Sequence, residues 1–288
     1  MNVLVTGCYG QLGTALQEIA ANSAHRWLFT DIDTLDICDP NAVERFFAAN
    51  GIDVCINCAA YTAVDKAEDE PELAYKVNVE APRILADCCL RHQATLYHIS
   101  TDYVFDGNGT RPYHEDDPTG PTSVYGKTKR DSEIAIQKSG CKAIIVRTAW
   151  LYFSTGKNFV KTMLQLADTR PELNVVNDQK GCPTWAHDLA LAIEILLDHY
   201  GSKTVHETFH FTNQGEVTWY EFAQAIMEIA GKRCTVNPIT TEQYPTKAKR
   251  PAYSVLDLSK IKTVTGMEIP FWKDSLAKCI EEINIKNK

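Results

Sequence analysis

The stretch NVLVTGCYGQLGTAL, residues 2–16, joins a short β-rich run to a glycine-containing turn and the start of a helical pattern. Its glycines, Gly7, Gly10 and Gly13, follow the spacing GxxGxxG. In a strand–turn–helix unit, such glycines permit the tight turn, the approach of a pyrophosphate to the backbone, and close packing of helix on strand. Asp31 ends the next β-rich run, where an acidic residue binds ribose hydroxyls. The stretch therefore predicts a dinucleotide-binding βαβ unit.

Strand-like and helical patterns alternate through the first half of the chain. We expect strands at 2–6, 26–31, 53–60, 95–101 and 142–150, and helices at 14–22, 41–49, 72–92 and 124–140, with Pro82 as a kink in the third helix. This alternation favours a parallel sheet covered on both faces. The prediction is an α/β fold, a Rossmann-type doubly wound parallel sheet, with a smaller C-terminal α/β substrate lobe. Residues 1–150 should form the NAD(P)-binding domain, with parts of 173–205 returning to it, and 151–288 mainly the substrate lobe.

Composition and charge exclude several classes of function. The 288 residues are 44% hydrophobic and 23% charged, which is ordinary for a globular protein. The formal net charge is −8 and no long basic run occurs, so neither nucleic acid nor an anionic membrane is expected as a partner. The sequence contains no run of 18 apolar residues, so we expect no segment that spans a bilayer. The N-terminus has no basic flank or cleavage site, so we expect the cytoplasm as location.

The chain contains ten cysteines, scattered through hydrophobic segments. In a reducing compartment such residues behave as small hydrophobic side chains. Cys55-x-x-Cys58 could indicate a redox or zinc site, but it lies inside the apolar run IDVCINCAA. No second pair of cysteines or histidines at ligand spacing completes a metal site. We therefore favour a structural role and predict no metal.

Tyr125 and Lys129 lie four residues apart at the start of the helical run 124–140, which places both on one helix face. By itself this spacing also suits an exposed tyrosine beside a solvated lysine. Thr101, however, ends the strand-like run 95–101, and ligands of open α/β sheets bind beyond the carboxyl ends of strands. A strand-end hydroxyl followed by Tyr-x-x-x-Lys resembles the triad of the short-chain dehydrogenase/reductase superfamily, and GxxGxxG is typical of its extended members. The resemblance implies that Thr101, Tyr125 and Lys129 are catalytic, and that Tyr125 and Lys129 also contact the cofactor.

These residue types suit the reduction of a ketone. A ketone that accepts hydride needs a proton donor at its oxygen, and the pKa of a free tyrosine is about 10. A nearby ammonium favours the phenolate and lowers that pKa. We therefore expect Lys129 to lower the pKa of Tyr125, and Thr101 to orient the substrate oxygen.

Further stretches resemble one family within this superfamily, the dTDP-4-dehydrorhamnose reductases. They include NCAAYTAVDKAEDEPELAYKVN (57–78), STDYVFDG (100–107), NDQKGCPTWAHDLA (177–190) and RPAYSVLDLSK (250–260), and they extend along the whole chain. The resemblance implies reduction of the 4-keto group of dTDP-4-dehydro-L-rhamnose to dTDP-L-rhamnose, the last step of dTDP-rhamnose biosynthesis. The alternatives are another extended short-chain sugar-nucleotide epimerase or dehydratase, or a non-catalytic regulatory binding subunit of the same fold.

The same resemblance implies the remaining site residues. The cofactor set is Gly7, Gly10, Gln11, Leu12, Gly13, Asp31, Asp36, Ile37, Ala60, Tyr61 and Thr62, with Asp36 and Ile37 flanking the adenine. The substrate set is Thr101, Asp102, Trp150 and Arg250, with Lys180 and Tyr253 as further candidates at the diphosphate–thymidine end. Asp36 could instead cap a turn, Trp150 could belong to the core, and Arg250 could be a solvated loop charge.

Either NADPH or NADH is expected as the cofactor. Asp31 would repel a 2′-phosphate, and no arginine follows it directly, which favours NADH, although members of the family accept both. Some members bind magnesium through glutamates and form dimers. This chain has Ala15 and His187 where those glutamates are expected. We therefore doubt a magnesium site and favour a monomer over a homodimer, with a small-molecule nucleotide-sugar as the partner.

Overall fold

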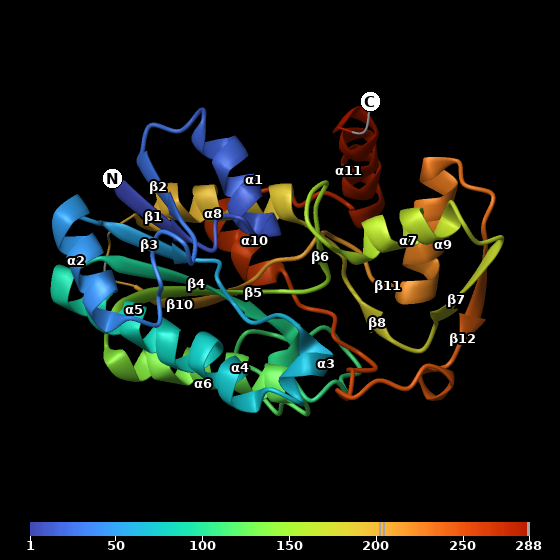
Figure 1. The fold of residues 1–288 in the computed structure, drawn as a ribbon, viewed down its shortest axis with the longest axis horizontal. Helices are drawn as coiled ribbons and strands as arrows, with labels where there is room; N and C mark the ends of the chain where they lie inside the picture. Colours follow the sequence, from blue (N-terminus) through green and yellow to red (C-terminus); the bar gives the residue numbers. More distant parts are fainter. Residues whose placement is uncertain (202, 204, 287–288) are drawn as a thin grey trace.

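The central feature of the molecule is one parallel sheet. The computed structural model describes residues 1–201, 203 and 205–286. Six strands pair in the order β10-β5-β4-β3-β1-β2 (Figure 1). They are β1 (Asn2–Thr6), β2 (Arg26–Thr30), β3 (Val54–Asn57), β4 (Thr95–Thr101), β5 (Lys142–Thr148) and β10 (His206–His210). The predicted doubly wound parallel sheet is confirmed.

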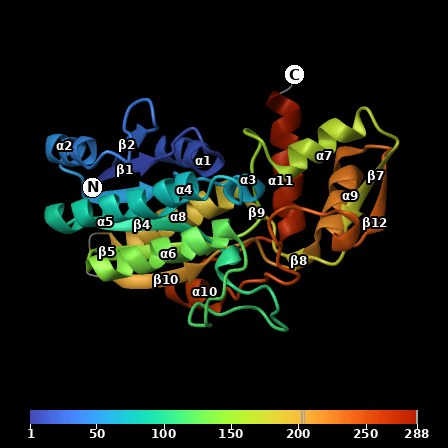
Figure 2. The ribbon, with the colours of Figure 1, turned by 60° about the horizontal axis from the view of Figure 1, so that its bottom comes forward.

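Helices cover both faces of this sheet (Figures 1 and 2). On one face, α1 (Gln11–Ala20) packs against α8 (Ala186–Tyr200), and α10 (Ser259–Thr265) packs against α8 and β10. On the other face lie α2 (Pro40–Asn50), α5 (Ala81–His92) and α6 (Val124–Ser139). Side chains of β1 alternate between the two layers, since Val3 and Val5 join one hydrophobic cluster and Leu4 joins the other. This period of two is what the pleat of a strand imposes.

The segment predicted as one helix at 72–92 consists of three elements. It contains α4 (Pro71–Tyr75), the π-helical turn η1 (Lys76–Glu80) and α5. Pro82 lies in the first turn of α5, and the π-helical turn directly before it accommodates the hydrogen bond that proline cannot donate. The expected break at Pro82 is therefore a π-helical turn and not a simple kink.

Two strands end at least two residues earlier than predicted. β3 ends at Asn57 and not at residue 60, and β5 ends at Thr148 and not at residue 150. Trp150 has a φ of 48°, a left-handed conformation that no strand can contain. Both chain segments turn away at the same edge of the sheet, where the candidate site lies.

A smaller lobe lies beyond the carboxyl ends of the strands (Figure 1). In it, β7 (Glu172–Val176) pairs in parallel with β12 (Thr235–Ile239), and α7 (Phe159–Ala167) packs against α9 (Trp219–Ala230). Two-residue strands add β6 (Leu151–Tyr152) paired with β9 (Thr184–Trp185), and β8 (Lys180–Gly181) paired with β11 (Val217–Thr218). The short helices α3 (Val64–Ala67), η2 (Asp102–Val104) and η3 (Thr241–Gln243) lie in connecting segments, and α11 (Trp272–Lys286) packs on α9 and β9.

The chain passes between the two lobes more than once. Within the range 173–205, α8 returns to the large sheet, and β10 follows just beyond that range. Most of β7 lies in the same range, but β7 pairs with β12 in the smaller lobe. We therefore propose an NAD(P)-binding domain of residues 1–150 completed by α8 and β10, and a substrate lobe formed mainly by the rest of 151–288.

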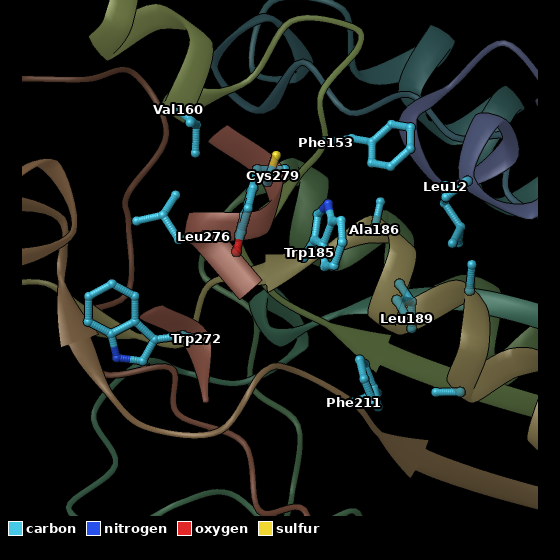
Figure 3. Close-up of a cluster of buried hydrophobic side chains, with 14 of the residues drawn as sticks. Leu12, Phe153, Val160, Trp185, Ala186, Leu189, Phe211, Trp272, Leu276 and Cys279 are labelled. Carbon is cyan, nitrogen blue, oxygen red and sulfur yellow. The ribbon is translucent and has the colours of Figure 1, made fainter. Parts of the chain in front are cut away.

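A continuous hydrophobic cluster connects the two lobes (Figure 3). Leu12 of α1 and Leu189 of α8 belong to it on the side of the sheet, and Trp272 and Leu276 of α11 belong to it on the side of the smaller lobe. Burial of each such side chain contributes about 1.5–3 kcal/mol. The shared core fixes the cleft between the lobes. None of the helices in the described residues is both long and apolar enough to cross a membrane.

Candidate active site

A cavity of about 650 Å³ lies at the carboxyl ends of β1, β3, β4 and β5. The strand order changes direction between β1 and β3, and open α/β sheets bind their ligands at this switch point. The structure brings most of the predicted residues together here. The lining includes Gly10, Gln11, Leu12, Gly13, Ala60, Thr62, Thr101, Asp102, Tyr125, Lys129 and Trp150.

The glycine turn has the form that a dinucleotide requires. Gly7 has a φ of 68°, and a Cβ placed on it would lie 2.7 Å from the backbone of Ala59. A Cβ on Gly13 would lie 2.4 Å from the carbonyl oxygen of Gly7. Helix α1 begins at Gln11 with no side-chain cap and no acidic residue in its first turn. Its first N–H groups can therefore bind an anion, so the residues present fit the pyrophosphate of NAD(P).

Asp31 adjoins this cavity through Tyr9. The Asp31 carboxylate accepts hydrogen bonds of 2.9 Å from the backbone N–H groups of Tyr9 and Ile32. The Tyr9 hydroxyl donates to Asp33 over 3.1 Å, and Tyr9 itself lines the cavity. Two carboxylates thus lie where the sequence predicts the adenosine ribose.

Besides Gly7 and Asp31, three further predicted cofactor residues do not line the cavity. The carboxylate of Asp36 accepts a 2.8 Å hydrogen bond from the backbone N–H of Cys38, which is the turn-capping alternative. The side chain of Ile37 is buried in the core. The Tyr61 hydroxyl donates to Glu70 over 2.5 Å. Cofactor contacts by these three residues stay predictions.

The three members of the predicted triad come together. Thr101 ends β4, and Tyr125 lies in the first turn of α6, where the Ser123 hydroxyl caps the helix. A Cβ on Gly126 would lie 2.3 Å from the carbonyl oxygen of Tyr103, so glycine at this position allows α6 to approach η2. The Thr101 hydroxyl lies close enough to the Tyr125 phenol to lower the pKa of that phenol.

Lys129 lies one helical turn after Tyr125 and is only 2% exposed. Its ammonium donates a 2.7 Å hydrogen bond to the carbonyl oxygen of Ile99 and lies 3.1 Å from Nε2 of His98. Burial lowers the pKa of Lys129 to about 8. A lysine whose pKa is close to neutrality can exchange a proton during catalysis.

The pKa of Tyr125 differs from the expectation. Burial raises it well above its ordinary value, and the nearby Thr101 hydroxyl only partly offsets that rise. The predicted lowering by Lys129 is wrong for the protein by itself, because burial raises the pKa of the phenol and the nearby Asp102 and Tyr103 raise it further. The phenol therefore keeps its proton at neutral pH, as a proton donor requires.

Asp102 is buried beside the triad. It accepts a 2.9 Å hydrogen bond from the Thr101 hydroxyl, and its second oxygen has no hydrogen-bond partner among the described residues. Burial raises the pKa of Asp102 to about 6, although the hydrogen bond from Thr101 lowers it. Asp102 lines the cavity, although this oxygen is itself buried.

We expect Asp102→Asn to stabilise the protein at pH 8 and to have no such effect near pH 4. The pKa of Asp102 is about 6 in the folded protein, and its ordinary value, which applies to the unfolded chain, is 3.8. Ionisation of Asp102 therefore reduces the stability of the folded protein as pH rises from 4 through 6. The shift corresponds to a gain of up to about 3 kcal/mol in the variant at high pH. Urea denaturation of both proteins between pH 4 and 8 measures this. A difference independent of pH would contradict it.

The predicted substrate residue Trp150 lines the cavity together with Trp219, which the sequence analysis did not identify as a site residue. It stacks on Trp219, the first residue of α9, with ring centroids 3.5 Å apart and planes 9° apart. A Cβ on Gly181 would lie within 2.9 Å of the Trp150 ring, so glycine leaves room for it. The only sequence signal for Trp219 is its place at the start of an amphipathic helix, which resembles a core position.

A second cavity, of about 700 Å³, lies in the smaller lobe and shares Trp219 with the first. Arg250 lines this cavity. Its guanidinium donates to Asp65 over 2.8 Å and to the hydroxyl of Tyr103 over 3.2 Å, so it links the smaller lobe to α3 and η2. The solvated alternative for Arg250 is therefore wrong. Lys180 pairs with Glu216 over 3.2 Å on the surface.

Metal ligands are sparse around the cavity. Ala15 is buried in α1, and His187 stacks on Trp185. Within the described residues, one cluster has metal-ligand spacing, formed by Glu44 of α2 with Cys88 and His92 of α5, and it is outside the lining of both cavities. All ten cysteines carry free thiols, and burial raises the pKa of Cys58.

Comparison with known proteins adds independent findings. The family model described as RmlD substrate binding domain matches residues 1–285. A dTDP-4-dehydrorhamnose reductase of Sinorhizobium fredii is 38% identical, with 100% of this chain and 99% of the relative covered. The structure of a dTDP-4-dehydrorhamnose reductase from Clostridium acetobutylicum superposes with a TM-score of 0.94 at 43% identity, covering 99% of this chain and 100% of that one. Another from Bacillus anthracis, in complex with NADP, gives a TM-score of 0.93 at 36% identity, covering 98% and 99%.

Proposed function

The chain belongs to the RmlD family, whose full-length relatives include dTDP-4-dehydrorhamnose reductases, and on this premise we propose that it reduces the 4-keto group of dTDP-4-dehydro-L-rhamnose with NAD(P)H. The product is dTDP-L-rhamnose. The observation that carries the proposal is the joint placement of Thr101, Tyr125 and Lys129 in a cavity that begins at a glycine turn suited to pyrophosphate.

The residues divide the chemistry between them. When bound, the reduced nicotinamide supplies hydride to the ketone carbon. Tyr125 donates its proton to the ketone oxygen, and its high pKa keeps that proton available at neutral pH. Thr101 hydrogen-bonds the same oxygen and orients it, since its hydroxyl already lies against the phenol. Lys129 donates to the ribose hydroxyls of the cofactor, and Asp102 accepts from a hydroxyl of the sugar.

The second cavity supports recognition of the rest of the substrate. It adjoins the first through Trp219, so a nucleotide-sugar can place its sugar against Trp150 and its nucleotide in the smaller lobe. Arg250 lies at this junction with donors in a planar fork that matches a diphosphate. The ion pair between Arg250 and Asp65 would rearrange when phosphate oxygens replace the carboxylate.

The decisive experiment is incubation of the protein with dTDP-4-dehydro-L-rhamnose and NADH or NADPH. The absorbance of the reduced nicotinamide should fall in proportion to substrate, and the product should be dTDP-L-rhamnose. An epimerase or dehydratase consumes no net NAD(P)H, and a regulatory subunit turns over no sugar nucleotide. Either result would refute the proposed reduction.

Asp31 should make NADH the better cofactor. We propose that its carboxylate and that of Asp33, both hydrogen-bonded to Tyr9, face the position of a 2′-phosphate. We expect Asp31→Asn to improve kcat/KM for NADPH relative to NADH by roughly tenfold, which corresponds to about 1.4 kcal/mol of relieved repulsion. Steady-state kinetics with both cofactors test this. A wild-type protein that already strongly prefers NADPH would show that Asp31 does not face the ribose.

The assembly and location rest on the sequence. We propose that the protein works as a monomer without magnesium, because Ala15 and His187 replace the expected glutamates. We also propose the cytoplasm as its location. Activity unchanged by EDTA and a monomeric mass at micromolar concentration are the expected results. A dimer that dissociates when EDTA is added would contradict both expectations.

A further inference from the structure

A buried chain of hydrogen bonds lies behind Lys129, and the reaction described above does not use it. It runs from Asn57 at the end of β3 through His98 in β4 to Ser132 in α6. These three side chains are at most 1% exposed. Their hydrogen-bond partners therefore have to be found within the protein.

The orientation of the Asn57 amide is determined by its neighbours. The backbone N–H of Ala59 donates to Oδ1 over 3.2 Å, and the hydroxyl of Thr6 donates to the same oxygen over 2.8 Å. Because a backbone N–H can only donate, the amide oxygen must lie on that side. The amide nitrogen of Asn57 is then the atom 3.2 Å from Nδ1 of His98.

This orientation selects one tautomer of His98. An amide N–H that donates to Nδ1 requires that Nδ1 carry no hydrogen, so the neutral ring carries its hydrogen on Nε2. Burial and the adjacent Lys129 hold the pKa of His98 well below its usual range, so the ring is neutral. Nε2 has its acceptor in the Ser132 hydroxyl at 3.0 Å, whose own hydrogen goes to the carbonyl oxygen of Lys129 over 2.6 Å.

Lys129 consequently faces an N–H group and not a lone pair. Its Nζ lies 3.1 Å from Nε2 of His98, and that nitrogen cannot accept a hydrogen bond in the tautomer fixed by Asn57. Within the part of the chain that the structure describes, its recorded acceptor is the carbonyl oxygen of Ile99. The other groups nearby do not replace His98, since Glu133 is engaged by Arg147 and the Cys58 thiol stays protonated.

We propose that His98, locked by Asn57 as the Nε2–H tautomer, is a positioning residue that denies Lys129 an internal acceptor and so couples cofactor binding to protonation of the lysine. The inference rests on the proposed function, in which Lys129 binds the cofactor ribose. In the free protein, the Lys129 ammonium faces this N–H group and has few internal acceptors, so the lysine readily loses a proton. When ribose hydroxyls offer acceptors on the cavity side, the ammonium form is favoured and one proton is taken up from solvent.

The sign of the pH dependence follows from this linkage. The pKa of Lys129 is about 8 in the protein alone, and contacts with ribose hydroxyls raise it in the complex. Between these two values the complex holds more protons than the free protein. The affinity for NADH should therefore be full below about pH 8 and weaken roughly tenfold per pH unit above it.

The tautomer can be measured directly on the wild-type protein. The ¹⁵N chemical shifts of the imidazole nitrogens distinguish a protonated from an unprotonated nitrogen, and the His98→Gln variant identifies which signals belong to His98. We expect a hydrogen on Nε2 and none on Nδ1 from pH 6 to 9. A hydrogen on Nδ1, or on both nitrogens, would overturn the proposal without any assay of turnover.

The coupling is tested by NADH binding between about pH 7 and 9.5, where lysine is the group expected to titrate. In Asn57→Asp the new carboxylate accepts a hydrogen bond from Nδ1, so Nε2 becomes an acceptor for Lys129. The pH above which the affinity for NADH begins to fall, here called the break, should therefore move upward by at least about one pH unit. The same substitution in a His98→Gln background carries only the added charge and should shift the break less. Equal shifts in both backgrounds, or a wild-type affinity without a break, would overturn the proposal.

Two features keep the test interpretable. Thermal unfolding of each variant shows whether it folds, and if Asn57→Asp does not, the tautomer measurement on wild type still decides. A protein that does not bind NAD(P)H at all would refute the proposed function. A protein that binds NADH with an affinity independent of pH refutes this inference alone.

Discussion

Replacement of Tyr125 by phenylalanine should reduce kcat by roughly 10²–10⁴-fold, the usual contribution of a positioned general acid. The phenol is the proton donor, and its neighbours Thr101 and Lys129 cannot replace it. A threonine hydroxyl holds its proton too tightly, and Lys129 is directed toward the carbonyl oxygen of Ile99. The KM for NADH should change little, because the phenol oxygen binds the substrate ketone. Steady-state kinetics with saturating cofactor measure both quantities.

Tyr103→Phe is the matched control for that variant. The Tyr103 ring contacts the Tyr125 ring edge to face, with centroids 5.6 Å apart, and its hydroxyl accepts from Arg250. The Tyr103→Phe variant also loses one phenol oxygen from this region, and it should lower kcat by less than about tenfold. Full activity of Tyr125→Phe, or an equal loss in both variants, would remove Tyr125 from the role of proton donor.

Replacement of Glu133 by alanine should lower the free energy of unfolding by about 3–5 kcal/mol, the effect expected when one member of a buried ion pair is removed. Glu133 and Arg147 are 5% and 6% exposed. The guanidinium donates to both carboxylate oxygens, over 2.9 and 2.7 Å, and the Ser100 hydroxyl donates a further bond of 2.5 Å. Alanine would leave the Arg147 charge without its counter-ion between α6 and β5. Urea denaturation at pH 7 measures the loss.

Two further variants show whether burial is the cause. Glu228→Ala breaks the exposed pair with Lys273 and should cost less than about 1 kcal/mol. The double variant Glu133→Leu, Arg147→Met removes both charges and should be more stable than Glu133→Ala, since an apolar pair needs no counter-ion. A loss in Glu133→Ala no larger than in Glu228→Ala would show that the buried pair does not stabilise the fold.

Local patterns were sufficient for much of the fold and of the site. The order of strands and helices follows from hydrophobic periodicity, and the GxxGxxG turn follows from the conformational freedom that Gly7 uses at a φ of 68°. The family resemblance placed Tyr125 and Lys129 one helical turn apart, and the cavity brings them together with Thr101. Such features depend on residues close in sequence, where spacing alone determines geometry.

Other features depend on contacts between distant segments. Sequence spacing could not show that Trp150 stacks on Trp219, that Arg250 pairs with Asp65, or that part of the chain after residue 173 pairs within the smaller lobe. The pKa of Tyr125 was predicted with the wrong sign because proximity to Lys129 can be read from the sequence, whereas desolvation depends on everything packed around the phenol.

The sequence by itself determined the parallel α/β architecture, the dinucleotide turn, and the family to which the chain belongs. Only the tertiary structure decided the protonation states in the active site, the hydrogen-bond chain from Asn57 to Ser132, and the second cavity that adjoins the first. The physical reason is that burial and hydrogen-bond geometry arise from groups brought together by folding, so no single stretch of residues contains them.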